Sequence, residues 1–201
     1  MVASVVVCKK PIGGHRLIYT GVFSFVFVAA VLLATARWWV RVPAVEPRFA
    51  IAAAQPLERG IFRLTIDARD PDTWVGVDFA AGKAITLDGV GEPGQSADLA
   101  VRRFEMRAFA GATDLGDVAL EHARLPRQPR WVVDEGRSHS RKNPLLATWY
   151  RYSYWTHMLR SERRTFAIRR FQGGIVYARF VSYYCAPEGS GCVTVYFRLG
   201  S

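Results

Sequence analysis

The chain has 201 residues, of which 50% are hydrophobic, and it carries a formal net charge of +10. This length suits one domain of ordinary size with an appendage. The arginines stand singly or in pairs rather than in a run, so the charge argues against a nucleic-acid partner and favours anionic lipid or an acidic partner. The sequence contains no metalloprotease, phosphate-loop or hydrolase nucleophile motif, and we therefore expect no enzyme.

An uncharged apolar stretch near the N-terminus predicts a transmembrane helix. Residues 17–36 are 20 consecutive residues without a charge, and a helix of that length spans about 30 Å, the thickness of the hydrocarbon core. With its aromatic flank the helix extends over residues 17–40. The alternative is a signal peptide cleaved after Ala34-Thr35-Ala36, but the apolar run is longer than the usual core of a signal. The residues expected to anchor the helix at the membrane surfaces are Arg16, Arg37, Trp38 and Trp39.

The rest of the chain predicts an all-β protein outside the membrane. We expect a cytoplasmic tail over residues 1–16, a proline-containing linker over residues 41–58, and one β domain over residues 59–201. Short apolar runs that alternate with polar residues, separated by Gly, Pro and Asp turns, indicate an antiparallel sheet or sandwich. The expected strands are 62–66, 74–79, 84–87, 99–109, 131–133, 146–158, 163–171, 175–184 and 193–199.

The last two expected strands are joined by a short Pro/Gly turn with a cysteine at each end. Cys185 and Cys192 face each other across this turn and predict a disulfide. A disulfide persists in oxidising compartments, so we expect the β domain in the periplasm. The protein would then be a single-pass protein of the inner membrane, cytoplasmic or photosynthetic, with its N-terminus in the cytoplasm.

Several motifs occur in a characteristic order along the expected β domain. They are Trp74-Val-Gly-Val-Asp-Phe, Asp98-Leu-Ala-Val-Arg-Arg-Phe-Glu-Met-Arg, Trp149-Tyr-Arg-Tyr-Ser-Tyr-Trp-Thr-His, Ser182-Tyr-Tyr-Cys and Gly191-Cys. This order resembles the HmuY-type family of haem-binding proteins, over about residues 60–200 and most specifically in the final hairpin. The resemblance implies an all-β domain outside the inner membrane. It also makes haem the candidate cofactor, although no other motif of the chain requires a cofactor.

Haem needs an axial ligand, typically His or Met. His157 and Met158 lie at the end of an aromatic strand and are the best candidates; the alternative is that His157 is a hydrogen-bonded residue at the strand end. His122 is expected on an exposed strand, His139 in a polar loop and Met106 in the core. No protein metal centre is expected, because the paired cysteines belong to the disulfide and no Cys-x-x-Cys occurs.

Aromatic residues and arginine are abundant enough to suggest an interface. Tyr, Trp and Arg are enriched where proteins dock. The alternative is that the aromatic residues form the core of a β-sandwich, with the tyrosine hydroxyls reaching water. We therefore expect a non-enzymatic accessory subunit that stabilises a larger integral-membrane complex, such as a photosynthetic reaction-centre–light-harvesting or respiratory assembly. Its partners would be integral-membrane protein subunits and the lipid bilayer; the alternative is a haem-binding or haem-relay protein at the periplasmic face. The interface candidates are Trp149, Tyr150, Tyr152, Tyr154, Trp155 and Arg179.

Overall fold

The computed structural model describes residues 26–28, 30–31, 46–87, 97–137 and 140–200. The chain divides into two units, and the second, Glu46–Ser201, holds the β domain. In the first unit the few described residues are helical. Most of the predicted span 17–40 lies outside the described residues, as do Arg16, Arg37, Trp38 and Trp39. Among the helices of the described residues, none combines the length and apolar character that a membrane crossing requires.

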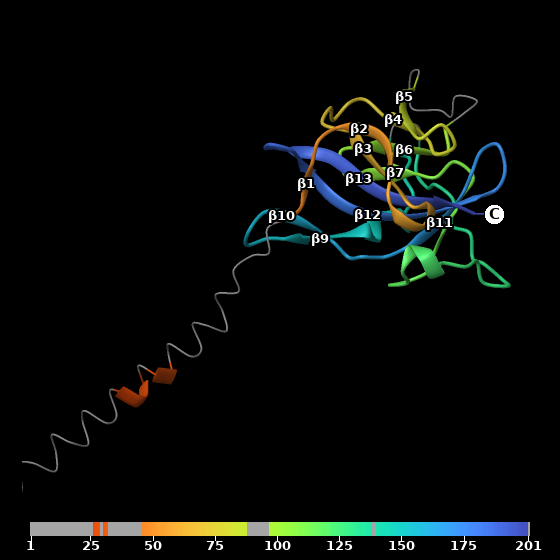
Figure 1. The fold of residues 1–201 in the computed structure, drawn as a ribbon. Coiled ribbons are helices and arrows are strands. Elements are labelled where there is room, and N and C mark those ends of the chain that lie inside the picture. Colours follow the sequence, from red (N-terminus) through yellow and green to blue (C-terminus); the bar gives the residue numbers. More distant parts are fainter. Residues whose placement is uncertain (1–25, 29, 32–45, 88–96, 138–139, 201) are drawn as a thin grey trace, which may run out of the picture. The chain divides into compact units, whose positions relative to one another are not determined.

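The larger sheet of the β domain has seven strands. Its order is β2 (Ala52–Pro56), β3 (Phe62–Asp67), β13 (Ser190–Leu199), β12 (Ile175–Cys185), β11 (Phe166–Arg169) and β8 (Ala112–Asp114), and β1 (Arg48–Phe49) pairs with β12. All of these pairings are antiparallel except that between β1 and β12. The long strands β12 and β13 run side by side through the domain (Figure 1).

Two smaller sheets complete the domain. Four strands, β5 (Lys83–Thr86), β4 (Val75–Asp78), β6 (Leu99–Arg102) and β7 (Glu105–Arg107), form an antiparallel sheet in that order, and β9 (Tyr150–Ser153) pairs with β10 (Met158–Ser161). The helices of the described β domain are short 3-10 turns, η1 (Glu58–Gly60), η2 (Leu120–His122) and η4 (Leu146–Trp149). The all-β, mainly antiparallel prediction is confirmed.

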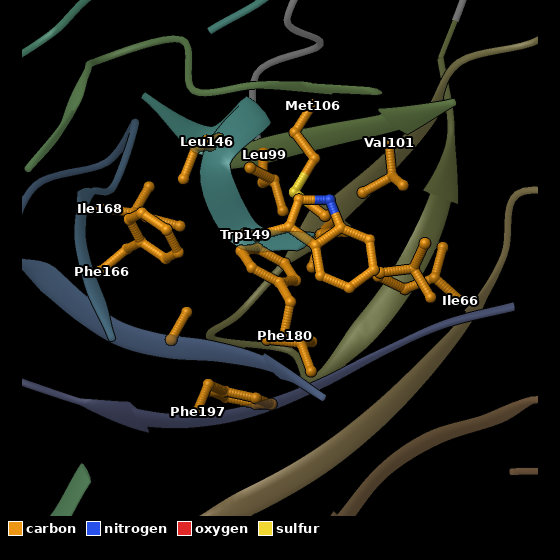
Figure 2. Close-up of a cluster of buried hydrophobic side chains, with 14 of the residues drawn as sticks. Ile66, Leu99, Val101, Met106, Leu146, Trp149, Phe166, Ile168, Phe180 and Phe197 are labelled. Atoms are coloured by element: carbon orange, nitrogen blue, oxygen red, sulfur yellow. The ribbon is translucent and has the colours of Figure 1, made fainter. Parts of the chain in front are cut away.

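The main core lies between the two larger sheets. Its buried side chains come from β3, β11, β12 and β13 on one side and from β4, β6 and β7 on the other. Trp149 lies among them, with its indole surrounded by Met106, Ile66 and Phe180 (Figure 2). Its side chain is only 2% exposed, and its ring N–H donates to the Phe104 carbonyl oxygen at 3.1 Å. Trp149 is therefore a core residue, and its prediction as an interface residue is wrong.

Two expected long strands are hairpins in the structure. The expected strand 99–109 is β6 and β7, joined at Arg103, whose φ of +54° reverses the chain. The expected strand 146–158 is η4 and β9, followed by a turn that leads into β10. Of the expected strand 131–133, only Val132 pairs, in an isolated bridge with Ala112.

The N-terminal boundary of the domain also differs from the prediction. Strands β1 and β2 lie within the predicted linker 41–58, yet β1 pairs with β12 and β2 pairs with β3. The β domain therefore begins near Glu46 rather than at residue 59.

The predicted disulfide is present. The Sγ atoms of Cys185 and Cys192 are bonded at 2.08 Å, and the Cα atoms are 5.0 Å apart. The bond joins the end of β12 to the start of β13 across a turn that contains a cis Ala186–Pro187 peptide bond.

Candidate ligand cavity

A cavity of about 500 Å³ lies where the β6–β7 turn, the β9–β10 hairpin and the ends of β12 and β13 meet. Its volume falls in the range of small-molecule sites, roughly 300–1,000 Å³. Four of its lining residues are tyrosines, so the wall combines apolar rings with polar hydroxyls. The lining residues are Arg103, Phe104, Tyr150, Tyr152, His157, Leu159, Tyr183, Tyr184 and Ser190.

The β6–β7 turn fixes one wall of the cavity. The Arg103 backbone N–H donates to the Ala68 carbonyl oxygen at 3.0 Å, and its guanidinium Nη1 donates to the Arg69 carbonyl oxygen at 3.2 Å. The neighbouring Phe104 ring packs edge-on against Tyr150 and Tyr183. Backbone and ring contacts together hold the turn against the strands.

The β9–β10 hairpin forms a second wall and is tied to β12 by two hydrogen bonds. The Leu159 N–H donates to the Tyr184 hydroxyl oxygen at 2.8 Å, and the Ser161 hydroxyl donates to the Phe180 carbonyl oxygen at 2.6 Å. Because one of these bonds uses a tyrosine of the cavity wall, the hairpin and the wall are positioned together.

Strand β12 contributes two consecutive residues, Tyr183 and Tyr184, to the cavity. Successive residues of a regular strand point to opposite faces of the sheet. The β12–β13 pairing, however, changes register between Phe180 and Ser182 and again between Ser182 and Tyr184. Such irregularities bend the strand and redirect side chains, which explains how both rings reach the same cavity.

The lining of the cavity contains one permanent positive charge and no carboxylate. Arg103 is the permanent cation among the lining residues, and none of those residues is Asp or Glu. The nearby carboxylate of Glu105 accepts hydrogen bonds from Arg102 at 2.8 Å and from Lys142 at 3.2 Å. Since two cations already neutralise Glu105, the Arg103 charge favours an anionic group in the cavity.

Three of the cavity tyrosines resist ionisation. Burial raises the pKa of Tyr183, and the Arg103 guanidinium acts in the opposite direction. Burial also raises the pKa of Tyr184, with the Leu159 N–H opposing it. For Tyr150 burial is again the main cause, and the charge of Glu105 adds to it. These hydroxyls are therefore neutral at physiological pH and can donate hydrogen bonds.

The structure separates the two residues predicted as haem ligands. His157 lines the cavity at the turn before β10, with φ at +52°, and its Nδ1 lies 2.6 Å from the Tyr152 hydroxyl oxygen. Met158 instead packs against the main core. Of the other candidates, Met106 is buried as expected, His122 is an exposed residue of η2 rather than of a strand, and His139 lies outside the described residues.

The remaining interface candidates lie in three different surroundings. Tyr154 and Trp155, at the turn of the β9–β10 hairpin, are 82% and 96% exposed. Arg179 is bound within the domain, where it donates to the Thr165 hydroxyl, the Val118 carbonyl and the Asp117 carboxylate. Tyr150 and Tyr152 line the cavity.

Six of the nine lining residues are not among the site residues that the sequence predicts: Arg103, Phe104, Leu159, Tyr183, Tyr184 and Ser190. Tyr183 and Tyr184 belong to the Ser182-Tyr-Tyr-Cys motif that carries the resemblance, and Arg103 is expected inside a continuous strand. Among the described residues, no group of three or more His, Cys, Asp or Glu side chains is arranged to hold a metal ion.

Comparison with known proteins identifies the class of fold. No protein-family model and no curated protein sequence matches the chain, but solved structures do. A structure described as a Bacteroides fragilis lipoprotein matches with a TM-score of 0.60 and 15% identity, over 73% of this chain and 95% of its own. A Bacteroides vulgatus protein described as an HmuY-like heme-binding protein matches with a TM-score of 0.60 and 18% identity, over 75% and 97%. The apo HmuY analog of Tannerella forsythia matches with a TM-score of 0.58 and 14% identity, over 69% and 95%.

The β domain therefore has the fold of the HmuY-like proteins, as the sequence resemblance predicted. At these identities the likeness establishes the fold and does not by itself assign a ligand to the cavity.

Proposed function

We propose that the β domain binds haem in the tyrosine-lined cavity. The observation that carries this proposal is the cavity itself, with aromatic walls and a volume of about 500 Å³ on an HmuY-like fold. A structural neighbour with this fold is described as heme-binding. Aromatic rings stack on flat ligands through offset and edge-on contacts, and several rings line this cavity. This reading was the alternative in the sequence analysis, and the structural likeness favours it over the accessory-subunit reading.

The residues of the cavity fit an iron porphyrin. When bound, haem would supply a redox-active iron, and His157 offers the imidazole that such iron accepts as a ligand. The Nδ1 atom of His157 faces the Tyr152 hydroxyl, so Nε2 is the nitrogen left for a metal. A hydrogen bond on the other ring nitrogen fixes the orientation of a metal-binding imidazole. Met158 is partly buried against the core and does not line the cavity, so the proposal depends on His157 alone.

A haemin titration of the purified full-length protein tests this proposal. We expect a shifted Soret band whose intensity saturates with haemin, and a weaker or shifted band in His157→Ala. The matched control is His122→Ala, since His122 is exposed on η2 and does not line the cavity. A featureless titration of the wild-type protein would remove the proposal.

The disulfide supports a location outside the cytoplasm. The Cys185–Cys192 bond persists in an oxidising compartment. We therefore propose a periplasmic β domain carried by the predicted membrane anchor. Alkylation of free thiols before and after reduction, on whole cells, tests this location. Two additional thiols should appear after reduction.

A second candidate function is docking onto integral-membrane subunits. The exposed pair Tyr154 and Trp155 favours it, because large aromatic side chains left in water commonly mark protein contacts. Native mass spectrometry after mild-detergent purification should then detect partner subunits with the wild-type protein and lose them with Tyr154→Ser/Trp155→Ser. Recovery of the wild-type protein as a lone monomer would contradict this function.

A further inference from the structure

The hydroxyl of Tyr183 is a buried donor that finds no acceptor among the described residues. The residue is 5% exposed, and its Oη atom has no acceptor within hydrogen-bond distance in that part of the chain. The neighbouring Arg103 guanidinium, which acts to lower the pKa of this hydroxyl, can only donate to it. A buried hydroxyl without a partner destabilises a fold, so most such groups serve a ligand or a water molecule. Because Tyr183 lines the cavity, the missing acceptor can come from the occupant.

Arg103 places a cation beside this hydroxyl. Its guanidinium carbon lies 5.7 Å from the centroid of the Tyr183 ring, and both residues line the same cavity. One guanidinium nitrogen, Nη1, is used by the Arg69 carbonyl oxygen. That bond holds the side chain in place without neutralising it, because a carbonyl oxygen carries no full charge.

We propose that Arg103 and Tyr183 form a subsite for a carboxylate of the bound porphyrin. The proposal rests on the proposed haem binding and adds the group that orients the ligand. A carboxylate is an acceptor-only group, whereas the guanidinium and the phenol both donate. Hydrogen bonds between ionised partners are roughly twice as strong as neutral ones. The carboxylate would satisfy the Tyr183 hydroxyl and neutralise the Arg103 charge together.

The same arrangement predicts that the carboxylate edge of the porphyrin lies beside Arg103 and Tyr183. His157 comes from the β9–β10 hairpin, and Arg103 comes from the β6–β7 turn. Two different elements would therefore hold the iron and the carboxylate edge. The subsite does not require iron, so a metal-free porphyrin tests it without interference from axial ligation.

The experiment compares metal-free protoporphyrin IX with its dimethyl ester, which keeps the ring and removes both carboxylate charges. Fluorescence titrations use the full chain in detergent. We expect the wild-type protein to bind the free acid about 10- to 100-fold more tightly than the ester, the usual weight of a hydrogen-bonded charge. Arg103→Gln and Tyr183→Phe should each reduce this ratio, while their affinity for the ester stays close to that of the wild-type protein. Arg103→Lys should keep part of the preference, since it keeps the charge but loses the fork of donors.

The controls are matched in type and lie outside the cavity. Tyr177→Phe changes another buried tyrosine of β12, and Arg169→Gln changes an arginine that stacks on Trp131 at 4.2 Å; neither should alter the ratio. Equal affinity for acid and ester in the wild-type protein would overturn the carboxylate subsite and leave porphyrin binding intact. If neither porphyrin nor haemin binds, the proposed function itself fails.

Discussion

At the residue scale, two glycines where the turn meets β13, Gly189 before the strand and Gly191 within it, differ in what surrounds them. Gly189 and Gly191 have φ values of +111° and +100°, a region that side chains with a Cβ avoid. A Cβ on Gly189 would meet nothing within 4 Å, whereas one on Gly191 would lie 2.9 Å from the Cα of Arg69. A side chain would therefore strain the backbone at both positions, but it would clash with a neighbouring residue only at position 191.

We predict that Gly191→Ala destabilises the domain more than Gly189→Ala does. Both substitutions incur backbone strain, about 1–2 kcal/mol, and overpacking against the Arg69 backbone adds roughly 1–3 kcal/mol for Gly191→Ala. Urea unfolding of both variants under oxidising conditions measures the difference. Equal losses would show that the Arg69 backbone moves aside at little cost.

A second prediction concerns Asp98, a carboxylate that is only 1% exposed. It accepts hydrogen bonds from the Phe79 N–H at 3.1 Å, the Phe171 N–H at 2.9 Å and the Arg170 guanidinium at 3.3 Å. Asp98→Ala leaves these donors unpaired, and we expect a loss of about 3–5 kcal/mol in the free energy of unfolding. The exposed Asp72 gives the control, since Asp72→Ala should change stability by less than about 0.5 kcal/mol. A small effect of Asp98→Ala in urea unfolding would contradict this account.

At the element scale, the short strands β1 and β2 decide where the domain begins. Strand β2 covers the edge of β3, and β1 adds two backbone pairs to β12 next to the disulfide. We predict that a fragment of residues 46–201 folds with a cooperative unfolding transition, while a fragment of residues 59–201 is less stable and more prone to aggregate, because it exposes the β3 edge. Urea unfolding and size-exclusion chromatography of the two fragments test this. Identical behaviour would mean that β1 and β2 are dispensable.

The sequence predicts the regular strands well and the cavity poorly, for physical reasons. Alternation in residues 62–66 and the β-branched and aromatic residues of 175–184 predict β3 and β12, because burial of one or both faces selects such residues. The reversal at Arg103 has no Gly, Pro or Asn to mark it, so residues 99–109 resemble one strand. Tyr183 and Tyr184 reach one cavity through register shifts in β12, which depend on the pairing with β13. His157 could be predicted as a site residue because histidine is a typical haem ligand.

At the scale of the whole molecule, ionisable groups limit the pH range of stability on both sides. Burial pushes the pKa of Glu105 upward, but the hydrogen bonds from Arg102 and Lys142 outweigh it, so the net pKa is lowered. A carboxylate with a lowered pKa stabilises the folded state at pH values above the ordinary pKa. This stabilisation is lost as the pH falls through the lowered pKa. On the alkaline side, burial raises the pKa values of the three cavity tyrosines, so the stability that they contribute is lost as the pH rises.

We predict that the domain loses stability above about pH 10, the ordinary pKa of tyrosine. Burial raises the pKa of Tyr150, Tyr183 and Tyr184 in the folded state, so the unfolded chain ionises first and is stabilised relative to the folded state as the pH rises. This stabilisation of the folded state is complete below the unfolded pKa and is lost as the pH rises through the folded one. The isoelectric point lies near 10.0, so net-charge repulsion is small in this range and does not mask the effect.

The variant Tyr183→Phe isolates the contribution of one cavity tyrosine. The free energy of unfolding, measured by urea from pH 8 to pH 11, should fall less steeply for Tyr183→Phe than for the wild-type protein, because one fewer buried hydroxyl separates the two states. Tyr154 is 82% exposed and meets water in both states, so Tyr154→Phe should keep the wild-type slope. Equal slopes for all three proteins would show that Tyr183 does not contribute to the alkaline loss. A bound porphyrin should move the alkaline transition to higher pH in the wild-type protein, because a ligand that binds only the folded state stabilises it.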